Sequence, residues 1–149
     1  MDDVTDERIL RRTFHLAKIA KNRGNGAFGA ILAEGKNVLL EAENTVAEGH
    51  GDPTCHAEMN VLREACKHYD KEDFSRFTLY CSSEPCLLGS GALYHCGVGR
   101  VVFGCSSEDF DQTRGLEMTC REILTKAGTR ITGPLLQTEA LALHASDPK

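Results

Sequence analysis

The sequence predicts an α/β domain, a three-layer α/β/α sandwich around a mixed central sheet of about five strands. Two observations support this fold class. Two short apolar runs are joined by Glu34, Gly35 and Lys36, which indicates a β-hairpin. After the hairpin, β runs alternate with helical segments, a pattern typical of βαβ crossovers with helices on both faces of a sheet.

Each element is predicted from its apolar spacing and its flanking residues. In chain order we expect a helix at 5–22, hairpin strands at 27–33 and 37–42, a helix from about 55 to 68, a strand at 77–82, a helix from 84 to about 95, a strand at 101–103, a helix at 115–126, an edge strand at 130–132 and a short helix at 137–144.

Proline and glycine mark several of these boundaries. Gly24 follows the apolar stripe of the first helix and ends it. Pro53 suits the start of the second helix, where its missing N–H removes no intrahelical hydrogen bond. Pro85 opens the third helix in the same way, and Gly97 is placed to end it.

Length and composition predict one intracellular domain spanning residues 1–149. The longest apolar runs, such as Ala27–Ala33, are too short to cross a bilayer, and the acidic N-terminus does not resemble a signal peptide. We therefore expect a cytoplasmic protein without a membrane segment. A net charge of −5 argues against a nucleic-acid partner, because binding a phosphate backbone usually requires a basic surface.

Two short motifs bear residues suited to metal chemistry. The first is His56-Ala57-Glu58, and the second runs from Glu84 through Pro85 and Cys86 to Gly89. Both lie where a helix is expected to begin, and the positive end of a helix dipole favours the thiolate form of cysteine. The seven cysteines of the chain are otherwise expected to be mostly buried free thiols.

The motifs resemble the zinc-dependent deaminase superfamily, whose nucleobase branch carries H-x-E followed by P-C-x-x-C. The first half matches fully, and the second matches as P-C-x-x-G. A further set of sequence segments resembles the branch that contains guanine, cytosine and transfer-RNA adenosine deaminases. It comprises Ala27-Phe28-Gly29-Ala30, Asp52-Pro53-Thr54-Cys55-His56-Ala57-Glu58, Gly91-Ala92-Leu93 and Gly99-Arg100-Val101-Val102-Phe103-Gly104.

The resemblance implies a role for each of six residues. His56 and Cys86 would be ligands of a Zn²⁺ ion that activates water, and Glu58 would be the catalytic carboxylate that moves protons. Asn44 would hydrogen-bond the base with Phe28 packed beside it, although Asn44 also suits a turn. Asp109 follows a predicted strand and is a weaker candidate for base contact. The resemblance also implies a homodimer.

Gly89 departs from the family pattern at the expected third zinc ligand. Glycine has no side chain, so zinc would be held by only two protein ligands there. The sequence leaves three explanations open: a site rebuilt around another ligand such as Cys81 or Cys105, a non-catalytic subunit or binding module, or a substitution that disables an enzyme. The leading prediction is a deaminase of a free base or nucleoside, with a transfer-RNA adenosine deaminase as the alternative.

Overall fold

The computed structural model describes residues 3–107 and 119–145. Its elements, in chain order, are helix α1 (Asp3–Asn22), strands β1 (Gly29–Glu34) and β2 (Asn37–Glu43), the 3₁₀ turn η1 (Pro53–Cys55), helix α2 (Ala57–Ala65), the 3₁₀ segment η2 (Lys71–Arg76), strand β3 (Thr78–Ser83), helix α3 (Leu87–Cys96), strand β4 (Arg100–Cys105), helix α4 (Cys120–Thr125), strand β5 (Arg130–Thr132) and helix α5 (Gln137–Ala142).

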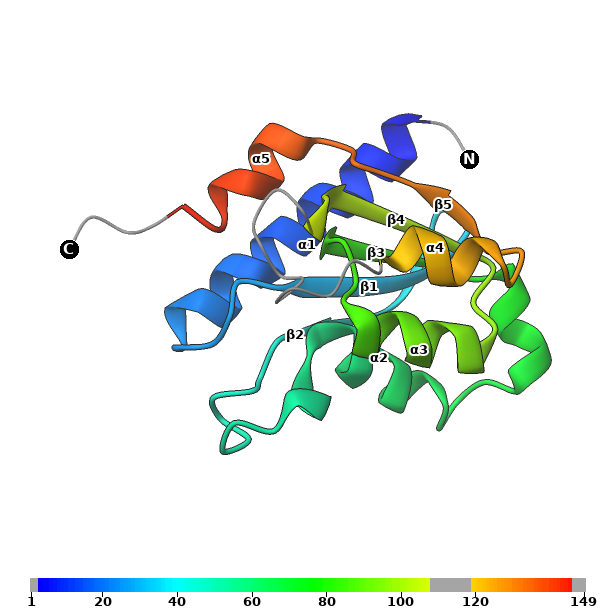
Figure 1. Ribbon diagram of the computed structural model, residues 1–149, viewed down its shortest axis with the longest axis horizontal. Helices are drawn as coiled ribbons and strands as arrows, with labels where there is room; N and C mark the ends of the chain where they lie inside the picture. Colours follow the sequence, from blue (N-terminus) through cyan, green and yellow to red (C-terminus); the bar gives the residue numbers. More distant parts are fainter. Residues whose placement is uncertain (1–2, 108–118, 146–149) are drawn as a thin grey trace.

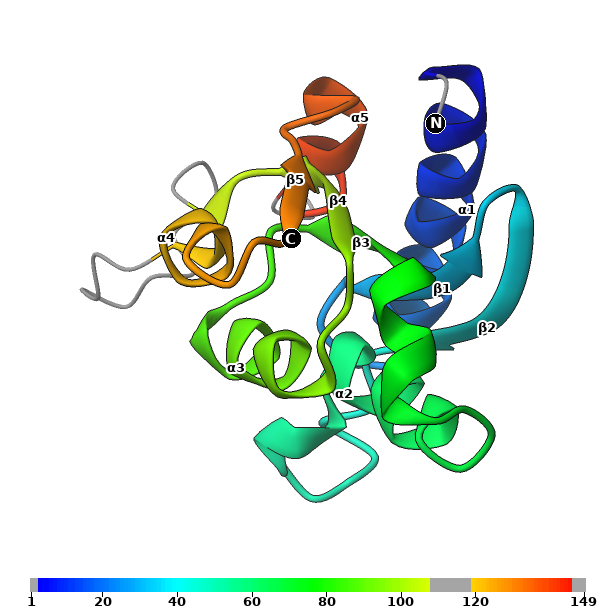
Figure 2. The same ribbon diagram turned by 90° about the vertical axis from the view of Figure 1, so that its right-hand side faces the viewer.

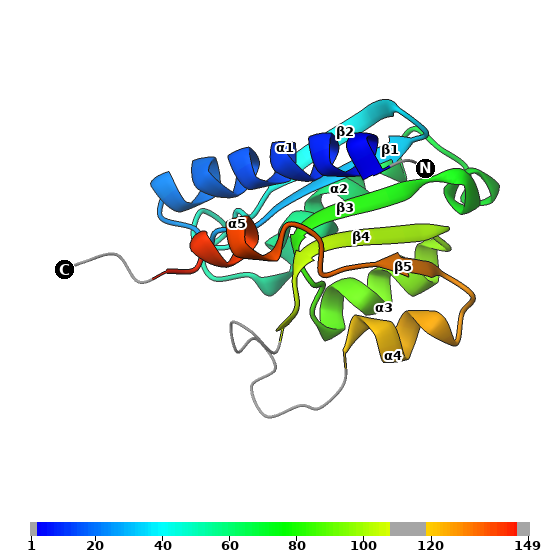
Figure 3. The ribbon, with the colours of Figure 1, turned by 90° about the horizontal axis from the view of Figure 1, so that it is seen from above.

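The five strands form one mixed sheet in the order β2-β1-β3-β4-β5. Strand β1 is antiparallel to both β2 and β3, so the hairpin is followed by a second antiparallel pairing. The remaining pairs, β3 with β4 and β4 with β5, are parallel and lie side by side in Figure 3. The predicted mixed sheet is therefore confirmed.

Helices cover both faces of this sheet, as Figure 2 shows. Helices α1 and α5 pack on one face over Ile31, Tyr80 and Val102. Helices α2, α3 and α4 lie on the other face, where Leu32 and Leu79 are buried beneath them. Alternate residues of the central strands thus enter two separate cores, which is the three-layer arrangement that the sequence predicts.

Three helix starts lie later than predicted. The helix expected at 115–126 begins only at Cys120, because Thr119 is extended and serves as its N-cap residue. The second helix was expected at Cys55, but Asp52 caps the η1 turn through Thr54 and α2 begins only at Ala57. The third helix was expected at Glu84, but Cys86 is extended and serves as the N-cap residue of α3. As a result His56 and Cys86 each stand immediately before a helix.

Two glycines have the backbone roles that their positions demand. Gly97 ends α3 in a left-handed conformation with φ of 78°, as predicted from the sequence. A Cβ on Gly29 would lie 2.4 Å from the Thr13 carbonyl oxygen, so glycine lets α1 pack directly against β1. Across the described ranges, no helix has the length and apolar content required to cross a membrane.

Candidate active site

The centre of the candidate site is the contact between His56 and Cys86. These residues precede α2 and α3, and His56 Nδ1 lies 3.6 Å from Cys86 Sγ. Zinc binds sulfur at about 2.3 Å and imidazole nitrogen at about 2.0–2.1 Å, so tetrahedral coordination places such donors about 3.6 Å apart. The spacing of these two donor atoms therefore fits two ligands of one zinc ion.

Gly89 lies at the third position of this arrangement, in the first turn of α3. A Cβ built on Gly89 would be 3.1 Å from Glu58 Oε2 and 3.4 Å from Pro85 Cβ. The third ligand position thus adjoins the Glu58 carboxylate. Within residues 3–107 and 119–145, no three His, Cys, Asp or Glu side chains form a group that could hold a metal ion. The described residues thus offer two donor atoms at a spacing that suits zinc, and they do not fit a complete three-ligand site.

The other cysteines do not fill the third position. Cys81 is fully buried, and burial together with the nearby Glu58 carboxylate raises the pKa of its thiol well above the ordinary value. The thiol of Cys105 donates a hydrogen bond to Ser83 Oγ at 3.5 Å. Cys96 ends α3 and is therefore at the opposite end of the helix from Cys86.

Glu58 is buried in the first turn of α2, with 6% of its surface exposed. Burial raises the pKa of its carboxyl, and the charge of His56 and a backbone hydrogen bond only partly oppose this effect. A carboxyl in this setting holds a proton at a higher pH than an exposed glutamate does. This upward shift is the one expected of a carboxyl group that accepts and returns a proton during a reaction.

Asn44 is buried directly after β2, and it forms part of a turn. Its Oδ1 accepts a hydrogen bond from Val46 N at 2.9 Å, and its backbone N donates to Phe28 O at 3.0 Å. The side-chain oxygen of Asn44 therefore takes part in a turn, as one of the two sequence interpretations expects. No hydrogen bond from Asn44 Nδ2 occurs within the described part of the chain, so the amide donor is still available to another group.

Phe28 is half-buried beside a residue that the sequence analysis did not identify. The imidazole of His144, just after α5, lies 5.2 Å from the Phe28 ring between centroids. His144 Nε2 also lies 2.8 Å from Ser83 Oγ, three residues before Cys86. Burial lowers the pKa of His144. Only the fold brings residue 144 here, because a lone histidine near the end of a short helix carries no sequence signal.

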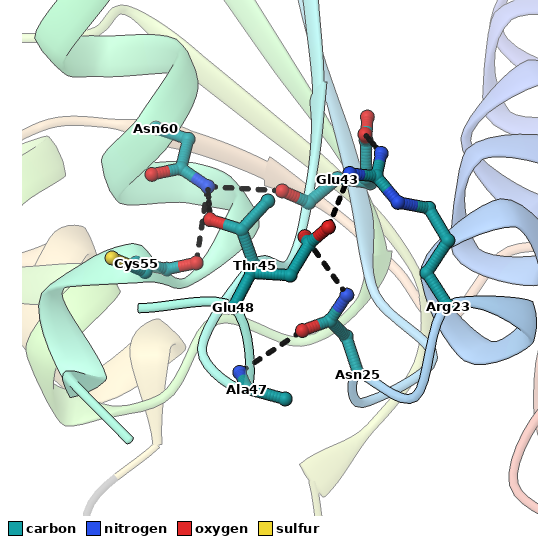
Figure 4. A network of polar contacts seen from close by, with 8 residues as sticks. All are labelled: Arg23, Asn25, Glu43, Thr45, Ala47, Glu48, Cys55 and Asn60. Atoms are coloured by element: carbon teal, nitrogen blue, oxygen red, sulfur yellow. Dashed lines mark hydrogen bonds and ion pairs between the residues drawn. The ribbon is translucent and has the colours of Figure 1, made fainter. Parts of the chain in front are cut away.

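The loop that leads into His56 is held by a network of polar contacts (Figure 4). Asn60 Nδ2, on α2, donates to Glu43 O, Thr45 Oγ1 and Cys55 O at 2.9–3.0 Å. Arg23 and Asn25 pair with Glu48 on the same loop. These contacts fix the loop that carries Asn44 and leads into His56.

Glu84 was noted in the second motif, but its role is visible only in the structure. Its carboxylate accepts hydrogen bonds from Ser107 N at 2.9 Å, Ser107 Oγ at 3.2 Å and Cys120 N at 3.0 Å. The buried carboxylate thus joins the segment after β4 to the start of α4, next to Pro85. Asp109 lies outside the described residues.

The arrangement defines a deaminase-type site, with a histidine, a cysteine and a buried glutamate at two adjacent helix starts. The family model for the cytidine and deoxycytidylate deaminase zinc-binding region matches residues 3–105. This chain belongs to that deaminase family. The resemblance predicted from the two motifs is therefore confirmed.

Curated relatives cover several activities. A probable cytosine deaminase of Schizosaccharomyces pombe is 34% identical, spanning 93% of this chain and 90% of its own length. A tRNA-specific adenosine deaminase of Haemophilus influenzae is 35% identical over 68% of this chain and 58% of its own. A guanine deaminase of Bacillus subtilis is 34% identical over 69% and 66%.

Solved structures give the same fold. The structure of NE0047 in complex with 2,6-diaminopurine matches with a TM-score of 0.78 and 25% identity, covering 91% of this chain and 77% of that chain. The ligand of that protein is an amino-substituted purine. In this chain the family match includes His56, Glu58 and Cys86, whereas His144 lies beyond it.

Proposed function

We propose that this chain is a hydrolytic deaminase of an amino-substituted nucleobase or nucleoside, of the guanine or cytosine type. The observation that carries the proposal is the convergence of His56, Cys86 and the buried Glu58 at the starts of α2 and α3. The S. pombe and B. subtilis relatives support the base-level substrate class. The net charge of −5 agrees with a small substrate better than with a nucleic acid.

The proposed metal ligands are His56 and Cys86, with Gly89 at the open third position. When bound, zinc in such a site supplies Lewis-acid activation of water. With two protein ligands, this chain should hold zinc more weakly than a three-ligand site does. We therefore expect the purified protein to contain well below one zinc ion per chain.

Glu58 is the proposed catalytic residue. Hydrolytic deamination replaces an exocyclic amine with oxygen from water and releases ammonia, so a proton must move from water to the ring and the leaving group. Glu58 adjoins the third ligand position, and its burial favours the protonated form midway through this transfer. It is the described residue best placed to carry the proton.

The base is proposed to lie between Asn44 and Phe28. Asn44 Nδ2 would donate to a ring nitrogen or carbonyl oxygen of the base, because its Oδ1 is already engaged by Val46. The tilted pair of Phe28 and His144 forms an aromatic wall suited to stacking on a planar ring. Asp109 stays a candidate for a further base contact.

Ammonia release from a substrate panel tests the function. The wild-type protein, supplied with zinc, is incubated with guanine, cytosine, adenine and their nucleosides, and we expect release from at least one of them. The Glu58→Gln variant should lose at least about 100-fold in rate while keeping base binding by calorimetry, because an amide cannot carry the proton. Base binding with no release from any substrate would instead favour a non-catalytic binding module.

Transfer RNA is the alternative substrate, favoured by the H. influenzae relative. This chain covers 58% of that enzyme's length, and its own net charge is negative. We expect no retention of transfer RNA in a filter-binding assay at physiological salt. Tight binding there would reverse the ranking of the two substrate classes.

A homodimer is also proposed, with α3 at its interface. Leu87, Leu88 and Tyr94 on α3 are 46%, 37% and 54% exposed, which leaves apolar side chains uncovered near the site. Light scattering of the purified protein should give twice the 16.3 kDa chain mass. A cytoplasmic location is proposed as well, since all seven cysteines are free thiols.

A further inference from the structure

Helices α2 and α3 carry matched residues at both of their ends. They pack against each other (Figures 1 and 2). Their starts hold His56 and Cys86. Cys66 follows His56 by ten residues, and Cys96 follows Cys86 by ten residues. Ten residues of helix rise about 15 Å, so in two helices packed side by side the second pair lies level with each other at the far end.

The two thiols at this far end are neighbours. Cys66 caps the C-terminus of α2 and is exposed, whereas Cys96 is the last residue of α3 and is half-buried against the core. Cys66 is close enough to Cys96 to contribute, after burial, to the raised pKa of the Cys96 thiol. Both cysteines are free, and neither takes part in the deaminase site.

We propose that Cys66 and Cys96 form an oxidative modification site, a dithiol that a low-molecular-weight disulfide converts into a bond between α2 and α3. The exposed partner, Cys66, is the first to react. This site is separate from the deaminase chemistry and does not depend on it.

The reaction proceeds by two exchanges, with oxidised glutathione as the co-reactant. The Cys66 thiolate attacks one glutathione sulfur, a mixed disulfide forms, and one glutathione leaves as its thiolate. The Cys96 sulfur, after losing its proton, attacks Cys66 Sγ and expels the second glutathione. The protein loses two electrons and two protons, and one oxidised glutathione becomes two reduced molecules.

The order of attack follows from the surroundings of each thiol. Burial raises the pKa of Cys96 to about 11, and the neighbouring Cys66 adds to this effect, so little Cys96 thiolate exists at neutral pH. Cys66 is accessible to a tripeptide disulfide, whereas Cys96 is shielded. Cys96 is therefore suited to resolve a mixed disulfide that forms on Cys66.

Mass spectrometry of the oxidised full-length protein tests the site. After incubation with oxidised glutathione, free thiols are alkylated and the chain is digested under non-reducing conditions. We expect a peptide containing Cys66 linked to one containing Cys96. The Cys66→Ser variant should give no link, the Cys96→Ser variant should stop at glutathione on Cys66, and the Cys55→Ser control should link as the wild type does.

Thermal unfolding supplies a second readout. A Cys66–Cys96 bond closes a loop that contains all of β3, and closing such a loop should raise the unfolding midpoint by roughly 5–10 °C. Dithiothreitol should reverse this shift in the wild type and have no effect in Cys66→Ser. Links between other cysteines, persistent glutathione on wild-type Cys66, or no oxidation at all would overturn the assignment.

Discussion

The Gly89→Cys variant is expected to purify with about one zinc ion per chain, whereas the wild type holds far less. Cysteine at this position places a second thiolate one turn after Cys86, on the same helix face. Losing a residue that only hydrogen-bonds a metal ligand typically lowers metal affinity about 10–100-fold. Adding a direct ligand should therefore raise the zinc affinity by at least about 100-fold. Elemental analysis and a competitive zinc titration measure both quantities.

The geometry around Gly89 allows this substitution. The nearest atom to an added Cβ is Glu58 Oε2 at 3.1 Å, the end of a side chain that can shift by a few tenths of an ångström. Gly91 offers a matched control, because it is on the same helix and a Cβ there meets no atom within 4 Å. Equal zinc gain in Gly91→Cys, or no gain in Gly89→Cys, would show that position 89 does not face the metal site.

The second large effect is expected at the buried ion pair between Asp6 and Arg100. Arg100 donates to both oxygens of Asp6 at 3.0 and 2.6 Å, and Tyr80 OH donates to the same carboxylate at 2.7 Å. Their side chains are only 2% and 11% exposed. Arg100→Met leaves the Asp6 charge buried without its partner and should lower the free energy of unfolding by about 3–5 kcal/mol.

An exposed pair provides the control for this variant. Arg11 pairs with Glu139 at 3.1 Å, but their side chains are 53% and 47% exposed. Arg11→Met should therefore cost at most about 1 kcal/mol. Urea unfolding of both variants measures the difference. Equal losses would mean that burial does not determine the contribution of the Asp6 pair.

The effect of Arg100→Met should also depend on pH. Burial alone would raise the pKa of Asp6, but hydrogen bonds from Arg100 and Tyr80 and the Arg100 charge hold it below the ordinary value. Because the pKa of Asp6 is lower in the folded state, its ionised carboxylate stabilises the fold at pH values above the unfolded pKa of about 3.9. This stabilisation is lost as the pH falls through the folded-state pKa. The stability difference should thus be full at pH 7 and shrink below about pH 4.

The layers of the fold could be predicted because their signals are local. The hairpin residues and the alternation of β runs with helices specify a mixed sheet covered on both faces. The exact helix starts could not be predicted, since the Asp52 cap forms a separate 3₁₀ turn before α2 and the extended Cys86 delays α3. These two short delays are what place His56 and Cys86 directly opposite each other.

Residues far apart in sequence account for what was missed at the site. Ser83 and His144 are 61 residues apart, and Glu84 and Cys120 are 36 apart, so no pattern in either segment indicates the contact. Asp6 lies in the first turn of α1, yet its partner Arg100 is 94 residues away. Motif spacing predicted the candidate residues that match a known chemical pattern, and only the fold shows the contacts that surround them.

The most direct test measures ammonia release by the Gly89→Cys variant and by the Gly89→Cys/Glu58→Gln double variant. It shows whether His56, Cys86 and Glu58, at the starts of two helices, form one deaminase centre. The single variant should release ammonia from guanine or cytosine faster than the wild type. The double variant should keep about one zinc ion per chain, as expected of a complete three-ligand site, and release almost none. Undiminished ammonia release by a zinc-loaded double variant would contradict the role of Glu58 and the account built on it.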